Sequence, residues 1–422
     1  KISSAHIMPQ NSKKNNKILK DTRIFPISIV YLKLEMKERT HKNMKESVNL
    51  HWASVWGNAV SIGENRPESY GKNITLRYPI YSAFDGDAVR LTFDNYCGTD
   101  SICIEKTTLL VAGKFYPVTF NNGNSQCIIP AGENLVSDPV ECEIKAGFFF
   151  KVSFYLKTYT QMRSVVYTSG PLSGGQYAVG DYSEIEEFPI NVSRKTSYNY
   201  FLSNVSVYTA KENRTIVCYG DSITAQDWPD YLTLRCKEEG FKNTAVIRRA
   251  TSGSRILREY DNITYESYGL SGKRRFSHEV PTDGADTVII QQGINDIIHP
   301  VGTDINPFRP MSDLPTADEL IEGLKTYIAQ ARDYGYKVYV GTLLPIEGWR
   351  TYAGFREDLR NTYNEWIRST DLIDGVIDFD KALCNPENQA AFLPEYDSGD
   401  HLHPSSAGYE RMAQEVTTAI LK

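Results

Sequence analysis

Residues 215–224 read TIVCYGDSIT, and this stretch marks the start of the strand–helix alternation in the chain. Its first five residues form an apolar run of the length of one buried strand, and Gly220 then ends the run with a turn. A serine at such a turn, here Ser222, presents its hydroxyl at the edge of a sheet, where the following helix favours developing negative charge. Alone the motif is a weak signal, because Ser and Asp are also the usual amino-terminal caps of helices.

The alternation of strand and helix continues from this stretch to the end of the chain. Five apolar runs predict strands at 215–219, 245–247, 287–291, 337–342 and 375–379. Helical patterns lie between and after them at 228–239, 316–334, 355–368 and 406–421, the second opened by the capping box Thr316-Ala-Asp-Glu319. We therefore expect residues 211–422 to form a doubly wound, flavodoxin-like parallel sheet of five strands, with ligands at the carboxyl ends of the strands.

Residues 48–210 show a different pattern, of period two or of short apolar runs between turns. Residues 88–94 read AVRLTFD, which places Val89, Leu91 and Phe93 on one face of a strand. Similar runs at 109–111, 116–120, 148–156 and 164–168 are separated by turns such as Asn121-Asn122-Gly123. No convincing helix interrupts them, so this region predicts an antiparallel β-sandwich of jelly-roll type.

Composition limits the classes of protein to which the chain can belong. With 422 residues, 41% hydrophobic and 23% charged, it is long enough for two or three globular domains. Its net charge of −6 combines +7 in residues 1–47, where 11 Lys and Arg meet 4 Asp and Glu, with −13 in the remainder. We expect residues 1–47 to be a basic, disordered leader, with Met36 or Met44 as the true start. The acidic remainder disfavours a nucleic-acid partner.

Cysteine usage and hydropathy exclude further classes. The seven cysteines lack the paired spacing of a zinc site and do not imply a disulfide framework. No stretch approaches the roughly 20 apolar residues that span a bilayer. These features mildly favour a cytoplasmic protein, with secretion as the alternative.

Two motifs follow the second and third predicted strands. Residues 251–255 read TSGSR, where Gly253 permits close approach of the backbone and a free N–H. Residues 293–296 read GIND, where Asn295 offers a side-chain amide donor. Each motif is equally well explained by itself as a loop that needs a glycine.

A fourth motif, DHLHP at residues 400–404, precedes the last predicted helix. In an i, i+3 turn Asp400 and His403 lie on one side, so that the carboxylate can hold the imidazole in one tautomer. The chain has only seven histidines, and a base that works near neutral pH is most easily sought among them. His401 lies two residues from this candidate base, and we expect it to pack or to contact substrate.

Together the four motifs resemble the SGNH, or GDSL-type, hydrolase superfamily over about residues 214–422. The chain is more similar still to two-domain bacterial acylhydrolases associated with xylan degradation, through segments such as NEWIR (364–368), VIDFD (376–380) and YDSGDHLHP (396–404). Such relatives carry a β-sandwich before the catalytic domain. The resemblance therefore implies 48–210 as an accessory domain and 211–422 as the catalytic domain.

The resemblance also implies a role for each motif. Ser222 would be the nucleophile, His403 the general base and Asp400 the residue that orients it. The backbone N–H groups of Ser222 and Gly253, with the side chain of Asn295, would form the oxyanion hole. No metal or cofactor is implied. The sequence departs from the family before Gly253, where Arg248 and Ala250 replace the Asn and Gly that relatives often carry.

Five neighbouring side chains carry weaker expectations. We expect Asp221 and Asp296 to brace their loops, and Arg255 to form a salt bridge or contact substrate. His299 is expected on an exposed loop, and Trp349 to be a packed aromatic or a platform for a sugar ring.

The sequence thus predicts a serine esterase that removes acyl groups, in the first place acetyl, from a carbohydrate or another small ester. One alternative is a lipase or lysophospholipase with the same triad. Another, of a different class, is a non-catalytic glycan-binding protein. A nucleotide-binding protein is excluded by the absence of G-x-x-x-x-G-K-[ST] and G-x-G-x-x-G motifs.

Overall fold

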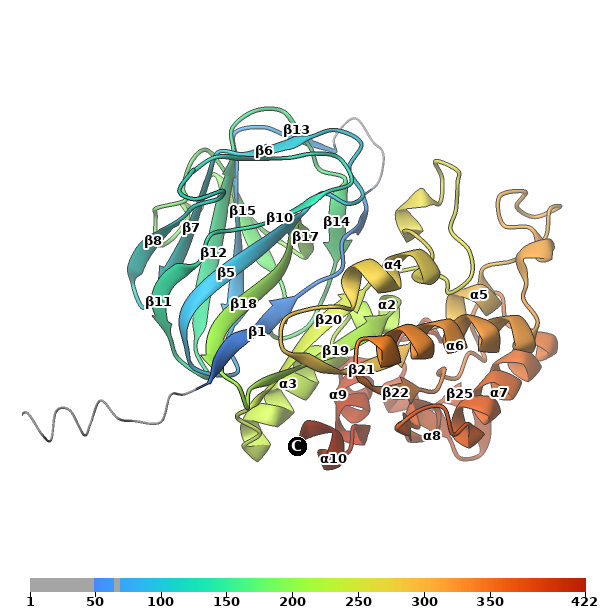
Figure 1. Cartoon of the computed structure of the whole chain (residues 1–422). Coiled ribbons are helices and arrows are strands. Elements are labelled where there is room, and N and C mark those ends of the chain that lie inside the picture. The colour runs from blue at the N-terminus through green and yellow to red at the C-terminus, as the bar shows by residue number, and fades with distance from the viewer. Residues whose placement is uncertain (1–48, 64–68) are drawn as a thin grey trace, which may run out of the picture. The chain divides into compact units, whose positions relative to one another are not determined.

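The structure is a computed structural model that describes residues 49–63 and 69–422. The leader expected at residues 1–47 lies outside the described residues. Asn49–Lys422 form one compact unit (Figure 1). The large sheets are antiparallel up to β18 (Leu202–Ala210), and the large sheet that begins with β19 (Arg214–Gly220) is parallel.

The carboxyl-terminal half contains the five-stranded parallel sheet that the sequence predicts. Its order is β20 (Thr244–Ala250), β19, β21 (Ala285–Gln291), β22 (Lys337–Gly341) and β23 (Gly375–Ile377). All four neighbouring pairs run parallel. The chain first moves outward to edge strand β20 and then crosses back past β19. Because such crossovers are right-handed, the helices on either side of this reversal cover opposite faces of the sheet.

Two groups of helices surround this sheet. In one, α3 (Trp228–Glu239) packs on α9 (Ser406–Glu415), and in the other α6 (Ala317–Asp333) packs on α4 (Gly272–Glu279) and α7 (Gly354–Ser369). The shorter helices are α2 (Ser222–Ala225), α5 (Ile294–Ile298), α8 (Phe379–Leu383) and α10 (Thr418–Leu421), with short 3₁₀ turns that include η1 (Glu266–Tyr268). The capping box at Thr316 and Glu319 is present as predicted.

Two predicted elements at the carboxyl end are wrong in detail. The single closing helix expected at 406–421 is two helices, because Val416 and Thr417 are extended, with ψ angles of 116° and 150°. The strand expected to reach Phe379 ends at Ile377, because the Asp378 side chain accepts from the Lys381 N–H and starts α8. A short hairpin, β24 (Cys384–Asn385) and β25 (Asn388–Phe392), was not predicted.

The amino-terminal half is built of antiparallel sheets. One has the order β1 (Leu50–Gly57), β18, β5 (Gly86–Asp94) and β10 (Asn134–Val136), with β11 (Val140–Ile144) also on β5. The other has the order β16 (Ser193–Thr196), β15 (Gly175–Val179), β4 (Ile74–Tyr81), β12 (Phe149–Leu156), β7 (Lys106–Val111) and β8 (Lys114–Val118). Smaller sheets join β17 (Tyr198–Tyr200), β14 (Ser164–Tyr167) and β2 (Ser61–Ile62); β13 (Thr160–Gln161) and β3 (Tyr70–Gly71); and β6 (Ile102–Ile104) and β9 (Cys127–Ile129).

One apolar core lies beneath both large antiparallel sheets. Leu91 of β5, Leu76 of β4 and Phe154 of β12 are all buried in it. Val89, Leu91 and Phe93 are fully buried, as their alternation predicts. This common core is consistent with the expected sandwich.

The other face of β5 contacts the carboxyl-terminal half of the chain. Arg90 forms an ion pair with Asp283 at 2.6 Å, and Asp94 lies 2.7 Å from Nε2 of His278 in α4. Polar residues on this face therefore join the two halves.

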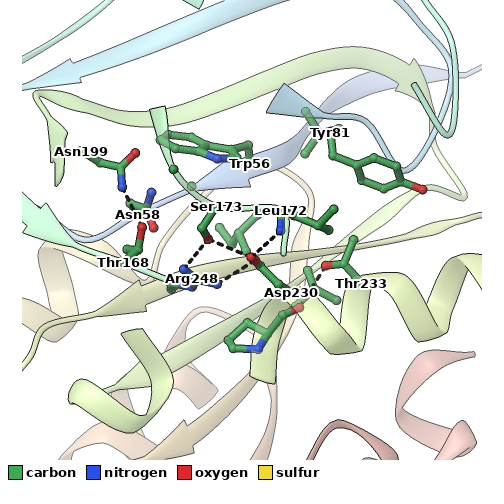
Figure 2. A pocket seen from close by; sticks show the side chains of 16 residues that line it. Trp56, Asn58, Tyr81, Thr168, Leu172, Ser173, Asn199, Asp230, Thr233 and Arg248 are labelled. Atoms are coloured by element: carbon green, nitrogen blue, oxygen red, sulfur yellow. Dashed lines mark hydrogen bonds and ion pairs between the residues drawn. The ribbon is translucent and has the colours of Figure 1, made fainter. Parts of the chain in front are cut away.

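Strand β20 also connects the halves, through Arg249 and through Arg248, which is one of the positions where the sequence departs from its relatives. Arg249 is buried and donates to the carbonyl oxygens of Asn58 and Ser203 at 2.8 and 2.7 Å. Arg248 forms an ion pair with Asp230 at 2.7 Å and donates to Ser173 at 2.8 Å (Figure 2). These contacts leave a small cavity of about 40 Å³ beside Arg248.

Among the described residues, no helix has the length and apolar character that a membrane span requires.

The contact between Asp94 and His278 predicts a pH-dependent stability. Burial opposes the charge on His278, but the hydrogen bond and charge of Asp94 outweigh burial and raise the pKa of the imidazole. Because the folded-state pKa lies above the unfolded one, the contribution is full below about pH 6.5 and is lost as pH rises through the raised value. We expect His278→Gln to cost roughly 1.5–3 kcal/mol at low pH.

Urea unfolding of the wild-type protein and of His278→Gln between pH 5.5 and 9 measures this effect. The difference in unfolding free energy should shrink as pH rises. A difference that is constant or grows with pH would contradict the assignment.

Candidate active site

Ser222 lies at the turn that the sequence predicts, between β19 and α2. The Asp221 side chain caps this helix by accepting the Ile223 N–H at 3.1 Å. Gly220 permits the turn, because a Cβ at this position would lie 2.4 Å from the carbonyl oxygen of Gln291 and 2.4 Å from Oγ1 of Thr224. The serine is therefore held at the carboxyl end of the central strands.

The structure brings Ser222, His403 and Asp400 together. His403 Nε2 lies 2.9 Å from Ser222 Oγ, and its Nδ1 lies 2.7 Å from Asp400 Oδ2. Since a carboxylate only accepts, Nδ1 carries the proton and Nε2 is left to accept the serine hydroxyl. This arrangement can activate a hydroxyl for attack on a carbonyl carbon.

Asp400 is held as an ionised carboxylate. Burial alone would raise its pKa, but hydrogen bonds from the His403 ring and from the backbone N–H groups of His403 and Leu402 lower it well below its ordinary value. Its Oδ1 accepts these two N–H groups at 2.8 and 3.0 Å, while Oδ2 faces the imidazole. The carboxylate therefore fixes the loop and the ring orientation together.

The other histidine of this loop faces a different partner. His401 Nδ1 lies 2.6 Å from Asp397, and the ring packs so closely on Gly348 that a Cβ there would lie 2.6 Å from it. His401 also adopts a φ of 63°, a conformation that is uncommon outside glycine. This geometry separates the two histidines that the sequence alone could confuse.

The three expected oxyanion donors lie on separate segments, two in the first turns of α2 and α5 and one on the loop after β20. Ser222 begins α2, so its N–H lacks an acceptor within the helix. Gly253 has a φ of 79°, and a Cβ at this position would lie 2.4 Å from the ring of Tyr268. Asn295 is buried and donates to the carbonyl oxygen of Ser254 at 3.1 Å, which leaves the second hydrogen of its amide.

Asp296 connects the second and third motifs, as a bracing residue should. Its two carboxylate oxygens accept the N–H groups of Ile256 at 2.7 Å and of Leu257 at 3.1 Å. Burial raises the pKa of Asp296 to about 6, although these hydrogen bonds act in the opposite direction. The loop that carries Gly253 is thus tied to the helix that carries Asn295.

Asp221 is the most isolated carboxylate near Ser222. One of its oxygens caps α2, but the other is buried and has no partner among the described residues. Burial raises the pKa of Asp221 to about 7, against the opposing effects of the Ile223 N–H and His403. Its contacts are those of a residue that braces the serine turn.

The expectation of an exposed His299 is wrong. The ring is buried, its Nδ1 lies 3.2 Å from the hydroxyl of Tyr260, and its centroid lies 4.9 Å from that of Tyr268. Burial, assisted by nearby arginines, lowers the pKa of His299 well below its ordinary value. This aromatic cluster was not predicted, although the tyrosines at 260, 265 and 268 after Gly253 are a signal for it in the sequence.

Two of the remaining candidates are explained by packing. Arg255 forms the salt bridge that was one of its two expected roles, at 3.0 Å from Asp313. Trp349 packs partly buried against the core, with its indole N–H buried and without a partner in the described chain. Within the described ranges, no group of three or more His, Cys, Asp or Glu side chains is placed to hold a metal ion.

Comparison with known proteins matches the same part of the chain. The model of the GDSL-like lipase/acylhydrolase family matches residues 218–411, which include all four motifs.

Residues 218–411 are a GDSL-like lipase/acylhydrolase domain.

The chain is accordingly a carboxylic ester hydrolase, whose carboxyl-terminal half has the SGNH hydrolase fold.

Solved structures also match this half of the chain. A GDSL-like lipase from Bacteroides thetaiotaomicron is 20% identical over 50% of this chain and 90% of its own, with a TM-score of 0.36. A lipase/acylhydrolase from Enterococcus faecalis is 21% identical over 49% and 95%, with a TM-score of 0.36. A catalytic variant of an acetylxylan esterase from Geobacillus stearothermophilus is 18% identical over 49% and 94%, with a TM-score of 0.37. No curated protein sequence matches the chain.

Substitution of the two histidines tests which one acts with Ser222. We expect Ser222→Ala and His403→Ala each to lower kcat on p-nitrophenyl acetate by about 10⁴-fold or more, since such residues act as one unit. His401→Ala should lower kcat by less than about tenfold, because His401 pairs with Asp397. Loss of activity in His401→Ala with activity retained in His403→Ala would contradict the geometry.

A pair of variants at Asp296 tests the bracing contact. Asp296→Ala leaves two N–H groups without an acceptor, at a cost of about 1–3 kcal/mol each, and frees the Gly253 loop. Because a displacement of about 1 Å costs on the order of 100-fold in rate, kcat should fall by that amount.

Asp296→Asn retains one acceptor oxygen, so its stability and its kcat should fall by less than those of Asp296→Ala. Equal effects of the two substitutions on thermal unfolding and on kcat would show that hydrogen bonding by Asp296 does not position the loop.

Proposed function

We propose that the chain is a serine esterase that removes short acyl groups, in the first place acetyl, from carbohydrate or other small esters through an acyl-enzyme. The observation that carries the proposal is the 2.9 Å approach of His403 Nε2 to Ser222 Oγ, with Asp400 behind the imidazole.

In the first half-reaction, Ser222 Oγ attacks the ester carbonyl carbon while His403 Nε2 takes the hydroxyl proton. The carbonyl oxygen becomes an oxyanion, stabilised by the N–H groups of Ser222 and Gly253 and by the Asn295 amide. Each such donor contributes about 3–4 kcal/mol in comparable sites. His403 then gives its proton to the leaving alcohol as the carbon–oxygen bond breaks.

In the second half-reaction, water attacks the acyl group on Ser222. His403 accepts a proton from this water and returns it to Ser222 Oγ as the carboxylic acid leaves. Asp400 stabilises the imidazolium in both halves without taking the proton itself.

Packing around the site supports a short acyl group. Ser222 is buried, and the ring of Tyr268 lies against Gly253 where any larger residue would project. Tyr260 and His299 pack behind that ring and hold it in place. We expect this aromatic wall, next to the oxyanion donors, to limit the length of the acyl chain that the site accepts.

Exposed apolar side chains favour a second candidate, a lipase-type hydrolase. Ile263 and Ile305 are 73% and 74% exposed, and Phe308 is 52% exposed. They lie on the loops that follow β20 and α5, and these loops contact each other through Asn306 and Tyr265. Apolar groups on loops at the carboxyl end of the sheet can contact a lipid surface.

Acyl-chain length distinguishes the two candidates. For p-nitrophenyl esters from acetyl to octanoyl, we expect kcat/KM to fall steeply with length, because the space beside Tyr268 is limited. A maximum of kcat/KM at the octanoyl ester would favour the lipase-type function instead. This maximum should be lost in the double variant Ile305→Ser/Phe308→Ser and kept in Phe355→Ser, a control at an exposed phenylalanine in α7.

Labelling of Ser222 tests whether this serine is the nucleophile of the hydrolase domain. A fluorophosphonate should modify the wild-type chain at Ser222, and His403→Ala should react far more slowly. Release of acetate from acetylated xylan, mannan and oligosaccharides then identifies the substrate. Absence of labelling and of acetate release would overturn the proposed function.

A further inference from the structure

A groove lined by tyrosines lies on the antiparallel half of the chain. Its volume is about 630 Å³, within the range of roughly 300–1,000 Å³ that is typical of ligand sites. Five tyrosines contribute to its lining: Tyr70, Tyr167, Tyr177, Tyr198 and Tyr200. None of them has a part in the proposed ester hydrolysis.

Three of these tyrosines, Tyr167, Tyr198 and Tyr200, belong to the small sheet of β17, β14 and β2, which turns their rings outward. Tyr167 pairs directly with Tyr198, and Val165 with Tyr200, so the side chains of all four project on one face. The other face carries Asn199, whose amide donates to Thr168 at 2.7 Å above the small cavity near Arg248 (Figure 2). The inner face thus joins the two halves of the chain, and the outer face lines the groove.

Exposure of so much aromatic surface needs an explanation. Tyr70, Tyr167 and Tyr198 are 47%, 42% and 50% exposed, although burial of such rings would stabilise the fold. In the described chain, the hydroxyls of Tyr167 and Tyr198 donate to no other group. Large exposed rings gathered in one concave surface are typical of a ligand groove.

The lining indicates a neutral ligand with both apolar and hydroxyl surfaces. Among the described residues that line the groove, Lys195 is the single charged side chain, beside Thr196 and Ser197. A lone lysine suits neither a polyanion, which needs several positive charges, nor a basic peptide. A tyrosine ring offers an apolar face to the C–H face of a pyranose and a hydroxyl to its O–H groups.

The tilt of the rings indicates a single chain rather than a flat crystalline surface. Tyr167 and Tyr198 are inclined at 70°, and Tyr198 and Tyr200 at 36°. Rings so inclined cannot all lie on one plane. They can contact successive residues of a soluble oligosaccharide that turns along its length.

The strand that carries Tyr167 is tied to the hydrolase domain at both ends. Before the strand, Arg163 forms an ion pair at 2.9 Å with Glu266 of η1, which ends at Tyr268 beside Gly253. After the strand, the hydroxyl of Ser169 donates at 2.5 Å to Asp227, five residues beyond Ser222. The groove is therefore coupled to the two loops that surround the candidate nucleophile.

We propose that this tyrosine groove binds the unreacted sugar residues of an acylated oligosaccharide whose ester is cleaved at Ser222. The choice of a sugar rests on the proposed function, whereas the groove itself rests on Tyr70, Tyr167 and Tyr198. A proline-rich peptide also binds between aromatic rings, but it does not account for the coupling to an ester-hydrolysing site.

Direct binding to an inactive chain tests the proposal. In Ser222→Ala, we expect an unacetylated β-1,4-linked hexasaccharide of xylose, glucose or mannose to bind measurably by calorimetry. Adding Tyr167→Ala/Tyr198→Ala should weaken this binding at least tenfold, because both stacking rings are removed. Tyr167→Phe/Tyr198→Phe, which keeps the rings, should retain most of it and shows that the fold tolerates the change.

Tyr159→Ala is the matched control, since Tyr159 is 75% exposed but lies outside the groove. It should bind the hexasaccharide as tightly as its parent. The proposal would be overturned if the control and the groove variant lost the same affinity for the hexasaccharide. It would also be overturned if a proline-rich peptide bound and no hexasaccharide did.

Hydrolysis of p-nitrophenyl acetate by the wild-type chain separates the two proposals. If the chain hydrolyses this ester but none of the hexasaccharides binds to Ser222→Ala, the groove proposal fails and the esterase stands. If a hexasaccharide binds through the tyrosines but no acyl ester is cleaved, the esterase fails and the groove remains a glycan site.

Discussion

Two buried guanidinium groups at the edge of the parallel sheet, those of Arg248 and Arg249, connect the two halves of the chain. An edge strand exposes unpaired backbone groups, and here β20 is covered by the antiparallel half of the chain. Arg249, within β20, donates to carbonyl oxygens on both sides of this contact, those of Glu279 and Ser203 among them. Burial lowers the pKa of Arg249, because it removes the charged guanidinium from water. Removal of one partner from such a network is more costly than its net contribution suggests.

The neighbouring Arg248 carries this constraint to the active site. Besides Asp230 and Ser173, it donates to the carbonyl oxygen of Ala225, the last residue of the helix that Ser222 begins. The antiparallel half is thus attached to the backbone that presents the nucleophile. The departure from the family pattern at this position therefore accompanies contacts between the two halves of the chain.

Burial and hydrogen bonding set different protonation behaviour for three carboxylates of one small region. Asp400 receives N–H groups and an imidazole, so its pKa is low and it can face a positive charge. Asp296 receives two backbone N–H groups but is more deeply buried, and its pKa rises to about 6. Asp221 has one unpartnered oxygen, and its pKa rises to about 7. Sequence spacing placed all three near Ser222, but only their surroundings distinguish the orienting carboxylate from the braces.

Local signals in the sequence were sufficient for the parallel sheet, the capping box and the loops that carry Ser222, Gly253, Asn295 and His403. These features depend on short-range pattern: apolar runs, a cap, and glycine where a Cβ would collide. The burial of His299, the orphaned oxygen of Asp221 and the break at Val416 could not be predicted, because each depends on residues distant in the chain. Tertiary packing likewise assigned His403 to Ser222 and His401 to Asp397, although both histidines lie within one five-residue motif. Short-range sequence pattern thus places the functional groups at the ends of the strands, whereas burial and the direction of each side chain in the folded chain govern which of them meet.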